Sequence, residues 1–85
     1  MQTVTPKTHL LQNLDNLHTT ELGALRITKN LSLTDPDPVQ WCKEFITSPN
    51  AEITKQGKNF YISHGNITIT VNARSFTIIT AHKIK

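Results

Sequence analysis

The sequence predicts an α+β domain in which three short N-terminal helices pack on one face of a four-stranded antiparallel meander. Apolar residues recur at helical spacing up to about residue 50, and beyond it the period changes to two. Threonine accounts for 13 of the 85 residues, and its branched polar side chain suits a sheet face that meets solvent. Because chains of this length rarely divide, we expect one domain, with a helical half at 1–50 and a sheet half at 51–85.

The first helix is predicted from a stripe of leucines. A hydroxyl at Thr5 or Thr8 can accept hydrogen bonds from the free amides that begin a helix. The apolar positions that follow fit one helical face. They are Leu10, Leu11, Leu14 and Leu17.

The second and third helices are each expected to begin at a capping residue. Thr20 is the predicted N-cap of the second helix, and Glu21 is favourable beside the positive end of the helix dipole. Asp37 caps the third helix, and Pro38 suits its first turn because the amide that proline lacks would be unpaired there. The expected inward faces are Ala24, Ile27 and Leu31, widened by Leu22 and Leu25, in the second helix, and Val39, Cys42, Phe45 and Ile46 in the third.

Alternating apolar and polar residues predict four strands joined by tight turns. The strands are placed at 51–55, 59–63, 67–73 and 76–82, and the turns at 56–58, 64–66 and 73–75. Phe60 and Ile62 are expected on one face of their strand, and Tyr61 and Ser63 on the other. In the last strand, Phe76, Ile78 and Thr80 are expected on one face and Thr77, Ile79 and Ala81 on the other.

Charge and cysteine content restrict the partners and the compartment. The net charge of +3 divides into −1 over residues 1–50 and +4 over residues 51–85, which favours an anionic partner for the sheet half. The single cysteine excludes an intrachain disulfide, and no apolar run resembles a signal peptide or a membrane span. We therefore expect a cytoplasmic protein without a membrane partner.

Imidazole and thiol side chains suggest a structural zinc site, because zinc takes four ligands from histidine, cysteine and carboxylates. His18, Cys42 and His82 lie in three predicted elements and would meet if the ends of those elements sit together. The fourth ligand would come from Glu21, His64 or Asp15. The alternative is that Cys42 packs as a small hydrophobic residue among surface histidines, since paired ligand spacings are absent from the sequence.

A second chemical hypothesis is metal-independent RNA cleavage, which needs an acid–base pair and cations that stabilise the phosphorane. His82 and His64 are candidate catalytic acid–base groups, and Arg74 is a candidate for holding phosphate. Further candidates are Arg26 and Lys83 for phosphate and Tyr61 for stacking. The alternative is that the threonine-rich basic face is simply solvated.

A third hypothesis assigns the exposed sheet face to binding. An antiparallel sheet with one solvated face offers a flat polar platform for a partner. The candidate binding residues are Tyr61, Thr68, Thr70, Asn72, Arg74 and Lys83. Aromatic residues make up only 6% of the chain, so recognition of RNA by base stacking has little support.

Five segments resemble those of a family of small uncharacterised bacterial and phage-borne proteins, and the resemblance covers nearly the whole chain. The segments are LHTTELG (17–23), RITKNL (26–31), WCK (41–43), GKNFYI (57–62) and ITVNARSFTIITAHK (69–83). The resemblance implies no activity, but it places His18, Cys42 and His82 in shared motifs, which favours the metal hypothesis. The C-terminal motif also contains Asn72, Ser75, Thr77 and Thr80.

Two wider resemblances bear on function. The order of helices and sheet, an arginine on an early helix and a final strand reading TIITAH resemble RelE-type ribonuclease toxins. In size and type the chain is similar to anti-CRISPR proteins, which bind an effector nuclease by surface complementarity and need no active site.

The leading hypothesis is therefore a small non-enzymatic inhibitor of phage or mobile-element type. It would act by protein–protein contact on a nucleic-acid-handling effector nuclease, with zinc as a structural cofactor. The alternative is a metal-independent ribonuclease toxin that acts on RNA.

Overall fold

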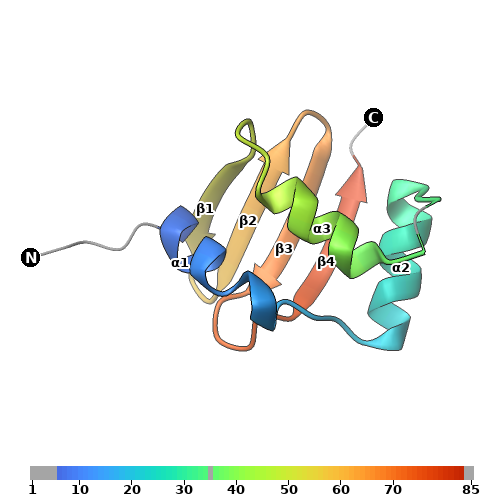
Figure 1. Ribbon diagram of the computed structural model, residues 1–85, viewed down its shortest axis with the longest axis horizontal. Coiled ribbons are helices and arrows are strands. Elements are labelled where there is room, and N and C mark those ends of the chain that lie inside the picture. Colours follow the sequence, from blue (N-terminus) through green and yellow to red (C-terminus); the bar gives the residue numbers. More distant parts are fainter. Residues whose placement is uncertain (1–5, 35, 84–85) are drawn as a thin grey trace, which may run out of the picture.

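The computed structural model, which describes residues 6–34 and 36–83, confirms the α+β fold class (Figure 1). Helices come first and the strands follow, in the order that the sequence predicts. The helical elements are α1 (Pro6–Gln12), the 3₁₀ turn η1 (Leu14–Asn16), α2 (Glu21–Leu31) and α3 (Pro38–Ile46). The strands are β1 (Glu52–Gln56), β2 (Asn59–His64), β3 (Ile67–Asn72) and β4 (Ile78–Lys83).

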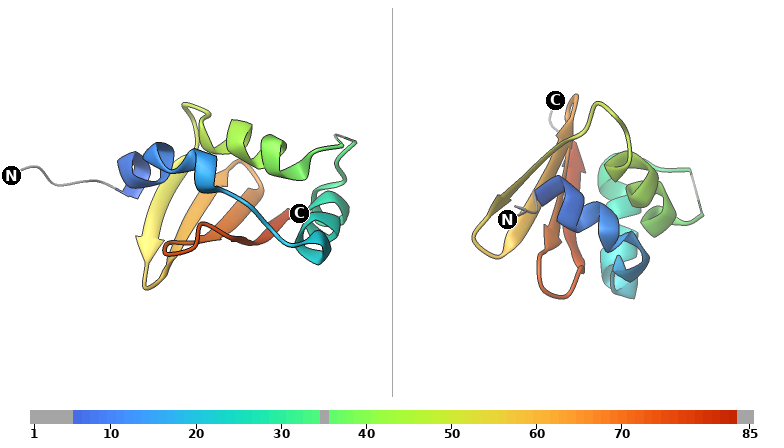
Figure 2. Two further views of the ribbon diagram at one scale, coloured as in Figure 1. Left: turned by 60° about the horizontal axis from the view of Figure 1, so that its bottom comes forward. Right: turned by 60° about the vertical axis from the view of Figure 1, so that its left-hand side comes forward.

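The four strands form one antiparallel sheet in the order β1-β2-β3-β4. Helices α1 and α3 lie over one face of this sheet, and α2 lies beside β4, whereas the opposite face carries no helix (Figure 2). We call the covered face the inner face and the opposite one the outer face. The outer face is thereby left open to solvent or to a partner.

The hydrophobic core fills the space between the helices and the inner face. Strands β2 and β3 alternate as the sequence predicts, with Phe60, Ile62, Ile69 and Val71 fully buried. The helices meet them with buried residues of their own, which are Leu10, Ile27, Leu31, Cys42 and Ile46. Burial of these apolar side chains is the main source of stability in so small a domain.

The two predicted helix caps are confirmed. The Thr20 side chain accepts a hydrogen bond from the Gly23 amide at 3.0 Å. The Asp37 carboxylate accepts one from the Gln40 amide at 3.0 Å, and Pro38 is the first residue of α3. Each cap pairs an amide that has no partner within the helix, which sets where the helix begins.

The first helix is shorter than its leucine stripe suggests. It ends at Gln12, and η1 follows it as a separate 3₁₀ turn. The Asn13 side chain donates to the carbonyl oxygen of His9 at 2.9 Å, so it pairs a carbonyl at the end of the helix. Of the two cap candidates, Thr8 lies inside α1, and Thr5 lies outside the described residues.

The prediction that Leu22 and Leu25 widen the buried stripe of α2 is wrong. Both side chains are 66% exposed, while Ile27 and Leu31 are buried. The reason is the position of α2, which packs beside the edge strand β4 and not across the broad inner face. A helix at the edge of a sheet buries only a narrow stripe.

The predicted alternation of the last strand is also wrong. The pairing of β3 with β4 shifts register between Thr70 and Val71, so Thr80 pairs with Thr70 while Ile78 pairs with Val71. The extra residue, Ile79, is 47% exposed, and Ile78 and Ala81 are buried on either side of it. A β-bulge of this kind exchanges the faces of the residues that follow it.

The outer edge of β4 is covered by the segment that leads into α2. The His18 amide donates to the Phe76 carbonyl at 3.1 Å, and the Ile78 amide donates to the His18 carbonyl at 2.7 Å. Side chains pair two further carbonyls of β4. The Thr19 hydroxyl donates to Ile78, and the Asn30 amide donates to Ala81, each at 3.1 Å. Four backbone groups at this edge are therefore paired within the molecule.

Candidate functional site

The outer face of the sheet presents hydroxyl and amide side chains. Tyr61 lies at its centre, because the Cα partners of Tyr61 are Thr54 on β1 and Thr70 on β3. Thr70 is only 7% exposed, since it lies between Tyr61 and Thr80 of the neighbouring strands. Among the described strand positions, the outer face therefore offers Tyr61 as an accessible aromatic group within a flat polar surface.

A second row of the outer face crosses the sheet two residues further along β2 than Tyr61. Thr68 is paired with Ser63 on one side and with His82 on the other. His82 and the adjacent Lys83 are exposed at the end of β4. Of the predicted binding residues, Tyr61, Thr68, Thr70 and Asn72 thus belong to the outer face, and Thr70 is nearly buried there.

Arg74 belongs to a different surface, formed by two turns at one end of the sheet (Figure 1). The turns are 57–58, between β1 and β2, and 73–75, between β3 and β4, and we call them together the turn end. The Ala73 amide donates to the Lys58 carbonyl at 2.7 Å, which fixes one turn against the other. The two turns are therefore neighbours in space, although they are far apart in the sequence.

Three cations gather at the turn end. Arg74 and Lys58 are exposed in the two turns. The Lys55 ammonium donates to the Gly57 carbonyl at 3.1 Å, which places its charge over the first turn. Within the described part of the chain, none of the three is ion-paired to a carboxylate.

The Asn72 side chain holds the second turn in shape. Its oxygen accepts from the Arg74 amide at 2.9 Å and from the Ser75 amide at 3.0 Å. This is the local pattern by which asparagine stabilises a turn. The amide oxygen of Asn72 is thereby occupied, so the side chain acts on the turn and is not free to bind a ligand with that atom.

A chain of hydrogen bonds continues from this turn to His18. Ser75 Oγ lies 2.8 Å from Thr77 Oγ1, which lies 3.1 Å from Nε2 of His18. On the other side of the ring, Nδ1 lies 2.8 Å from the carbonyl oxygen of Asn16. A carbonyl can only accept, so Nδ1 carries the proton, and in the neutral ring Nε2 accepts from the Thr77 hydroxyl.

The residue between Ser75 and Thr77 has an unusual backbone conformation. Phe76 has φ of 58°, in the left-handed region that L-residues with bulky side chains avoid. Its amide donates to the Asn72 carbonyl at 2.9 Å, and its ring stacks on Phe60 with centroids 6.3 Å apart. These contacts hold a strained residue beside the exposed turn, and such strain is characteristic of functional sites.

The expected zinc ligands do not converge. Cys42 is fully buried in α3, where burial raises the pKa of its thiol to about 12, while His18, Glu21 and His82 are exposed. Over residues 6–34 and 36–83, no group of three or more histidine, cysteine or carboxylate side chains is placed to hold a metal ion. This donor set does not fit zinc as arranged, and the zinc hypothesis itself stays a prediction.

The candidate catalytic residues of the ribonuclease hypothesis also lie apart. His64 and His82 end β2 and β4, which run in the same direction, so both lie near the end of the sheet opposite to the turn end. Arg74 is in the turn end. Arg74 is therefore separated from both histidines by nearly the length of a strand, and the three residues do not form one site.

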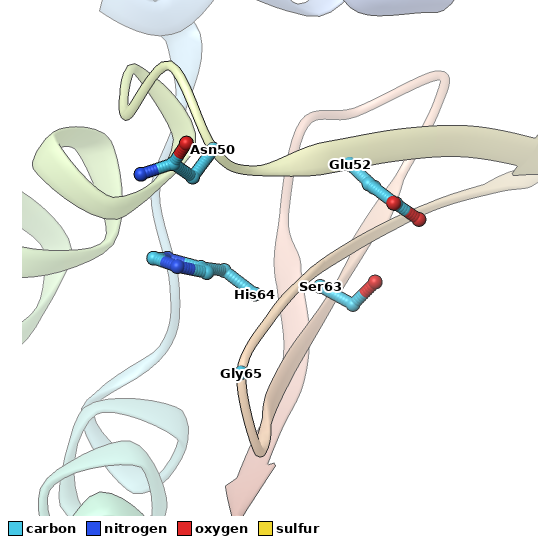
Figure 3. A pocket seen from close by; sticks show the side chains of 5 residues that line it. All are labelled: Asn50, Glu52, Ser63, His64 and Gly65. Carbon is cyan, nitrogen blue, oxygen red and sulfur yellow. The ribbon is translucent and has the colours of Figure 1, made fainter.

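A shallow pocket of about 250 Å³ lies beside His64 (Figure 3). It is lined by Asn50, Glu52, Ser63, His64 and Gly65. Glu52 and Ser63 point to one side, whereas His64 points toward Asn50 (Figure 3). Because neighbouring strand residues face opposite ways, Ser63 and His64 cannot act as a nucleophile and its base.

The candidate site residues predicted from the sequence do not include Lys55 and Lys58. A signal for them was present, because the first and third turns of a four-stranded meander always lie at the same end of the sheet. Because turns 56–58 and 73–75 are the first and third turns, this topology predicts that Lys58 and Arg74 lie at the same end of the sheet. The contact of Ser75 and Thr77 with His18 had no comparable local signal.

None of the helices in the described part of the chain combines the length and the apolar character that crossing a bilayer requires. Comparison with the curated proteins and with the solved structures finds no match to the chain. A family model does match, over residues 11–82, and it therefore includes α2, α3, the turn end and all of the sheet except Lys83. This agrees with the expected resemblance to a family of uncharacterised proteins. The chain belongs to the family of proteins of unknown function DUF3781.

Proposed function

We propose that this protein is a small non-enzymatic inhibitor or adaptor that acts by protein–protein contact through the outer face of its sheet. The observation that carries the proposal is the uncovered outer face, a flat polar surface with Tyr61 at its centre. Tyrosine is among the residues that contribute most to protein interfaces, because it buries a large rigid ring and keeps a polar tip. The proposed partner is an effector that handles nucleic acids, as in the anti-CRISPR comparison.

The composition of the outer face favours a protein over RNA as its partner. Base stacking on a sheet usually uses two or three aromatic residues, and among the described positions of the outer face Tyr61 is accompanied only by the ring of His82, in another row. The hydroxyl and amide groups around it, among them Thr54 and Thr68, suit hydrogen bonds with a polar protein surface.

Charge indicates how such an inhibitor would act. A protein that replaces nucleic acid in an effector must carry negative charge, but this chain has a net charge of +3. The proposed mode is therefore contact with a neutral or acidic region of the effector, and not occupation of its basic nucleic-acid channel. The ribonuclease alternative has less support, because its candidate residues His82 and Arg74 lie at opposite ends of the sheet.

Site-specific crosslinking in the native host tests this proposal. A photoreactive benzophenone residue is placed at Tyr61, and in a matched control at the exposed Gln40 of α3, on the helical side of the molecule. We expect one dominant protein adduct from the first position and none from the second, identified by mass spectrometry. Identical adducts from both positions, or none from the first, would contradict the outer face as the contact surface.

A binding measurement with the crosslinked partner completes the test. Tyr61→Ala is expected to weaken binding at least tenfold, as is typical of a central interface tyrosine. Gln40→Ala is expected to leave affinity unchanged. Turnover of labelled RNA by the purified protein would argue for the ribonuclease instead.

A further inference from the structure

We infer that the turn end is a second binding site, one that grips the phosphate backbone of a nucleic-acid strand through Lys55, Lys58 and Arg74. This site is distinct from the outer face, and the inference does not depend on the identity of a protein partner. It combines a charge pattern, the donor groups of the cations and a rigid local structure.

Positive charge at the turn end supports this assignment. Lys55 lies near the end of β1 beside the turn 57–58, which contains Lys58, and Arg74 lies in the turn 73–75. The 2.7 Å bond from the Ala73 amide to the Lys58 carbonyl joins the two turns. Residues 55–58 and 73–75 include no carboxylate. Unpaired cations gain more from an arriving anion than paired ones, because no existing attraction is lost.

Hydrogen-bond donors supplement the charge. The Arg74 guanidinium has the planar fork that matches two phosphate oxygens, while lysine acts as a point charge. The Ser75 hydroxyl beside it donates to Thr77 Oγ1 in the hydrogen-bonded chain to His18, so the cations supply the donors for a phosphate. Phosphate contacts in proteins typically combine such groups.

The turn is held in one conformation before any ligand arrives. Asn72 accepts from the Arg74 and Ser75 amides, and Ser75 is tied through Thr77 to His18. The left-handed Phe76 follows directly and is anchored by its buried ring. A loop that is already ordered loses less entropy when it binds, so this framework favours binding.

The shape of the turn end favours nucleic acid over an acidic protein. A stable protein interface buries roughly 800 Å² on each partner and has an apolar centre. The turn end has protruding cations and hydroxyls, and its large apolar residue Phe76 is buried. A phosphate backbone requires no apolar contact, so we expect weak binding without base specificity.

Salt dependence gives the sharpest test. The full chain is titrated against a short fluorescent oligonucleotide, single-stranded or duplex, and its anisotropy is measured at several salt concentrations. Three phosphate contacts predict a slope of log K against log salt of about −2 for a single strand and about −3 for a duplex. Affinity should then fall roughly 20- to 60-fold between about 50 and 200 mM salt. A slope near zero would overturn the inference.

Matched variants separate the site from overall charge. Arg74→Ala and Lys58→Ala are each expected to reduce affinity. Each should also make the slope of log K against log salt less steep, by the amount that corresponds to about one phosphate contact. Lys29→Ala removes the same charge from the exposed surface of α2 and should change neither. Equal losses for Lys29→Ala and Arg74→Ala would show a general charge effect and would overturn the assignment.

Two further measurements complete the test. Asn72→Ala keeps every charge, so it should weaken binding through a looser turn while the salt slope stays the same, and circular dichroism checks that the variant is folded. Polyglutamate serves as the competing ligand. If polyglutamate binds more tightly than the oligonucleotide at equal charge, the site is one for acidic proteins and the inference fails.

Discussion

The Nε2 atom of His18 lies 3.1 Å from Oγ1 of Thr77, although 59 residues separate the two in the chain. The same two residues form a parallel backbone bridge, so the segment before α2 is joined to the start of β4 by main chain and side chain together. This junction closes the hydrogen-bonded chain that holds the turn end.

We expect His18 and Thr77 to be energetically coupled. His18→Ala and Thr77→Val should each lower the free energy of unfolding by about 1 kcal/mol, and the double variant should lose about 0.5–1 kcal/mol less than their sum. Urea unfolding of the four proteins measures the coupling. In a control cycle, Thr80→Val replaces Thr77→Val, and its coupling with His18→Ala should be near zero; equal coupling in both cycles would contradict the role of the bond.

Cys42 makes stability fall at alkaline pH. Burial raises the pKa of its thiol from 9.0 to about 12 in the folded protein, so between these values the unfolded chain loses a proton that the folded chain keeps. Loss of that proton stabilises the unfolded state by about 1.4 kcal/mol per pH unit in this range. We therefore expect the free energy of unfolding to be about 1.4 kcal/mol lower at pH 10 than at pH 8 through this residue alone.

The matched control for this pH effect is Cys42→Ala. The variant starts less stable, but it keeps every other titrating group, so the difference between the two pH profiles isolates the thiol. Parallel profiles for the two proteins would show that Cys42 ionises as readily in the folded state as in the unfolded chain. In the folded protein the thiol should also resist alkylation.

Gly23 is required by close packing, although it lies inside a helix. A Cβ atom at this position would collide with Thr19 Oγ1, the atom that donates to the Ile78 carbonyl. In a helix, glycine to alanine usually stabilises by roughly 0.5–1 kcal/mol, but here Gly23→Ala should destabilise, because displacement of the hydroxyl leaves a part-buried carbonyl unpaired at a cost of about 1–3 kcal/mol.

The sign should reverse when the hydroxyl is absent. In a Thr19→Ala background the closest obstacle is gone and the nearest remaining side-chain oxygen, Thr20 Oγ1, is 3.2 Å away, so Gly23→Ala should raise stability over Thr19→Ala alone. Thermal unfolding of the two singles and the double provides the comparison. Destabilisation by the same amount in both backgrounds would point to another cause.

The exposed leucines of α2 should contribute little to folding. Leu25→Gln is expected to change the free energy of unfolding by less than about 0.5 kcal/mol, since its side chain is 66% exposed. Ile27→Ala, two positions away and buried, should cost about 2–5 kcal/mol. A loss for Leu25→Gln as large as that for Ile27→Ala would contradict the edge position of α2.

Local patterns predicted most of the fold. The caps at Thr20 and Asp37 and the alternation of β2 and β3 depend on residues a few positions apart, and all are found. The alternation of faces predicted for the last strand is wrong because a hydropathy pattern does not indicate a β-bulge or a left-handed phenylalanine. Burial of Leu22 and Leu25 is wrongly predicted for a similar reason. Periodicity shows which residues share a helix face, but it does not show how wide the surface is against which that face packs.

The site was predicted less completely than the fold. Tyr61 and Thr68 follow from strand parity and lie on the outer face as expected. Arg74 was named, but its neighbours Lys55 and Lys58 were not, because their proximity depends on the topology of the meander. The gathering of Ser75, Thr77 and His18 depends on a contact between distant segments, which no single stretch of sequence reveals.

The covered edge of β4 determines how copies of this protein can join through their sheets. Within the described part of the chain, β1 and β4 are the two edge strands of the sheet, and residues 18–19 and Asn30 occupy part of the β4 edge. An open filament needs a free edge at both ends of every sheet. The segment that covers β4 therefore hinders the addition of a further strand along Ile78–Ala81, whereas the hydrogen bonds described above, all within residues 6–34 and 36–83, place no comparable obstacle along β1.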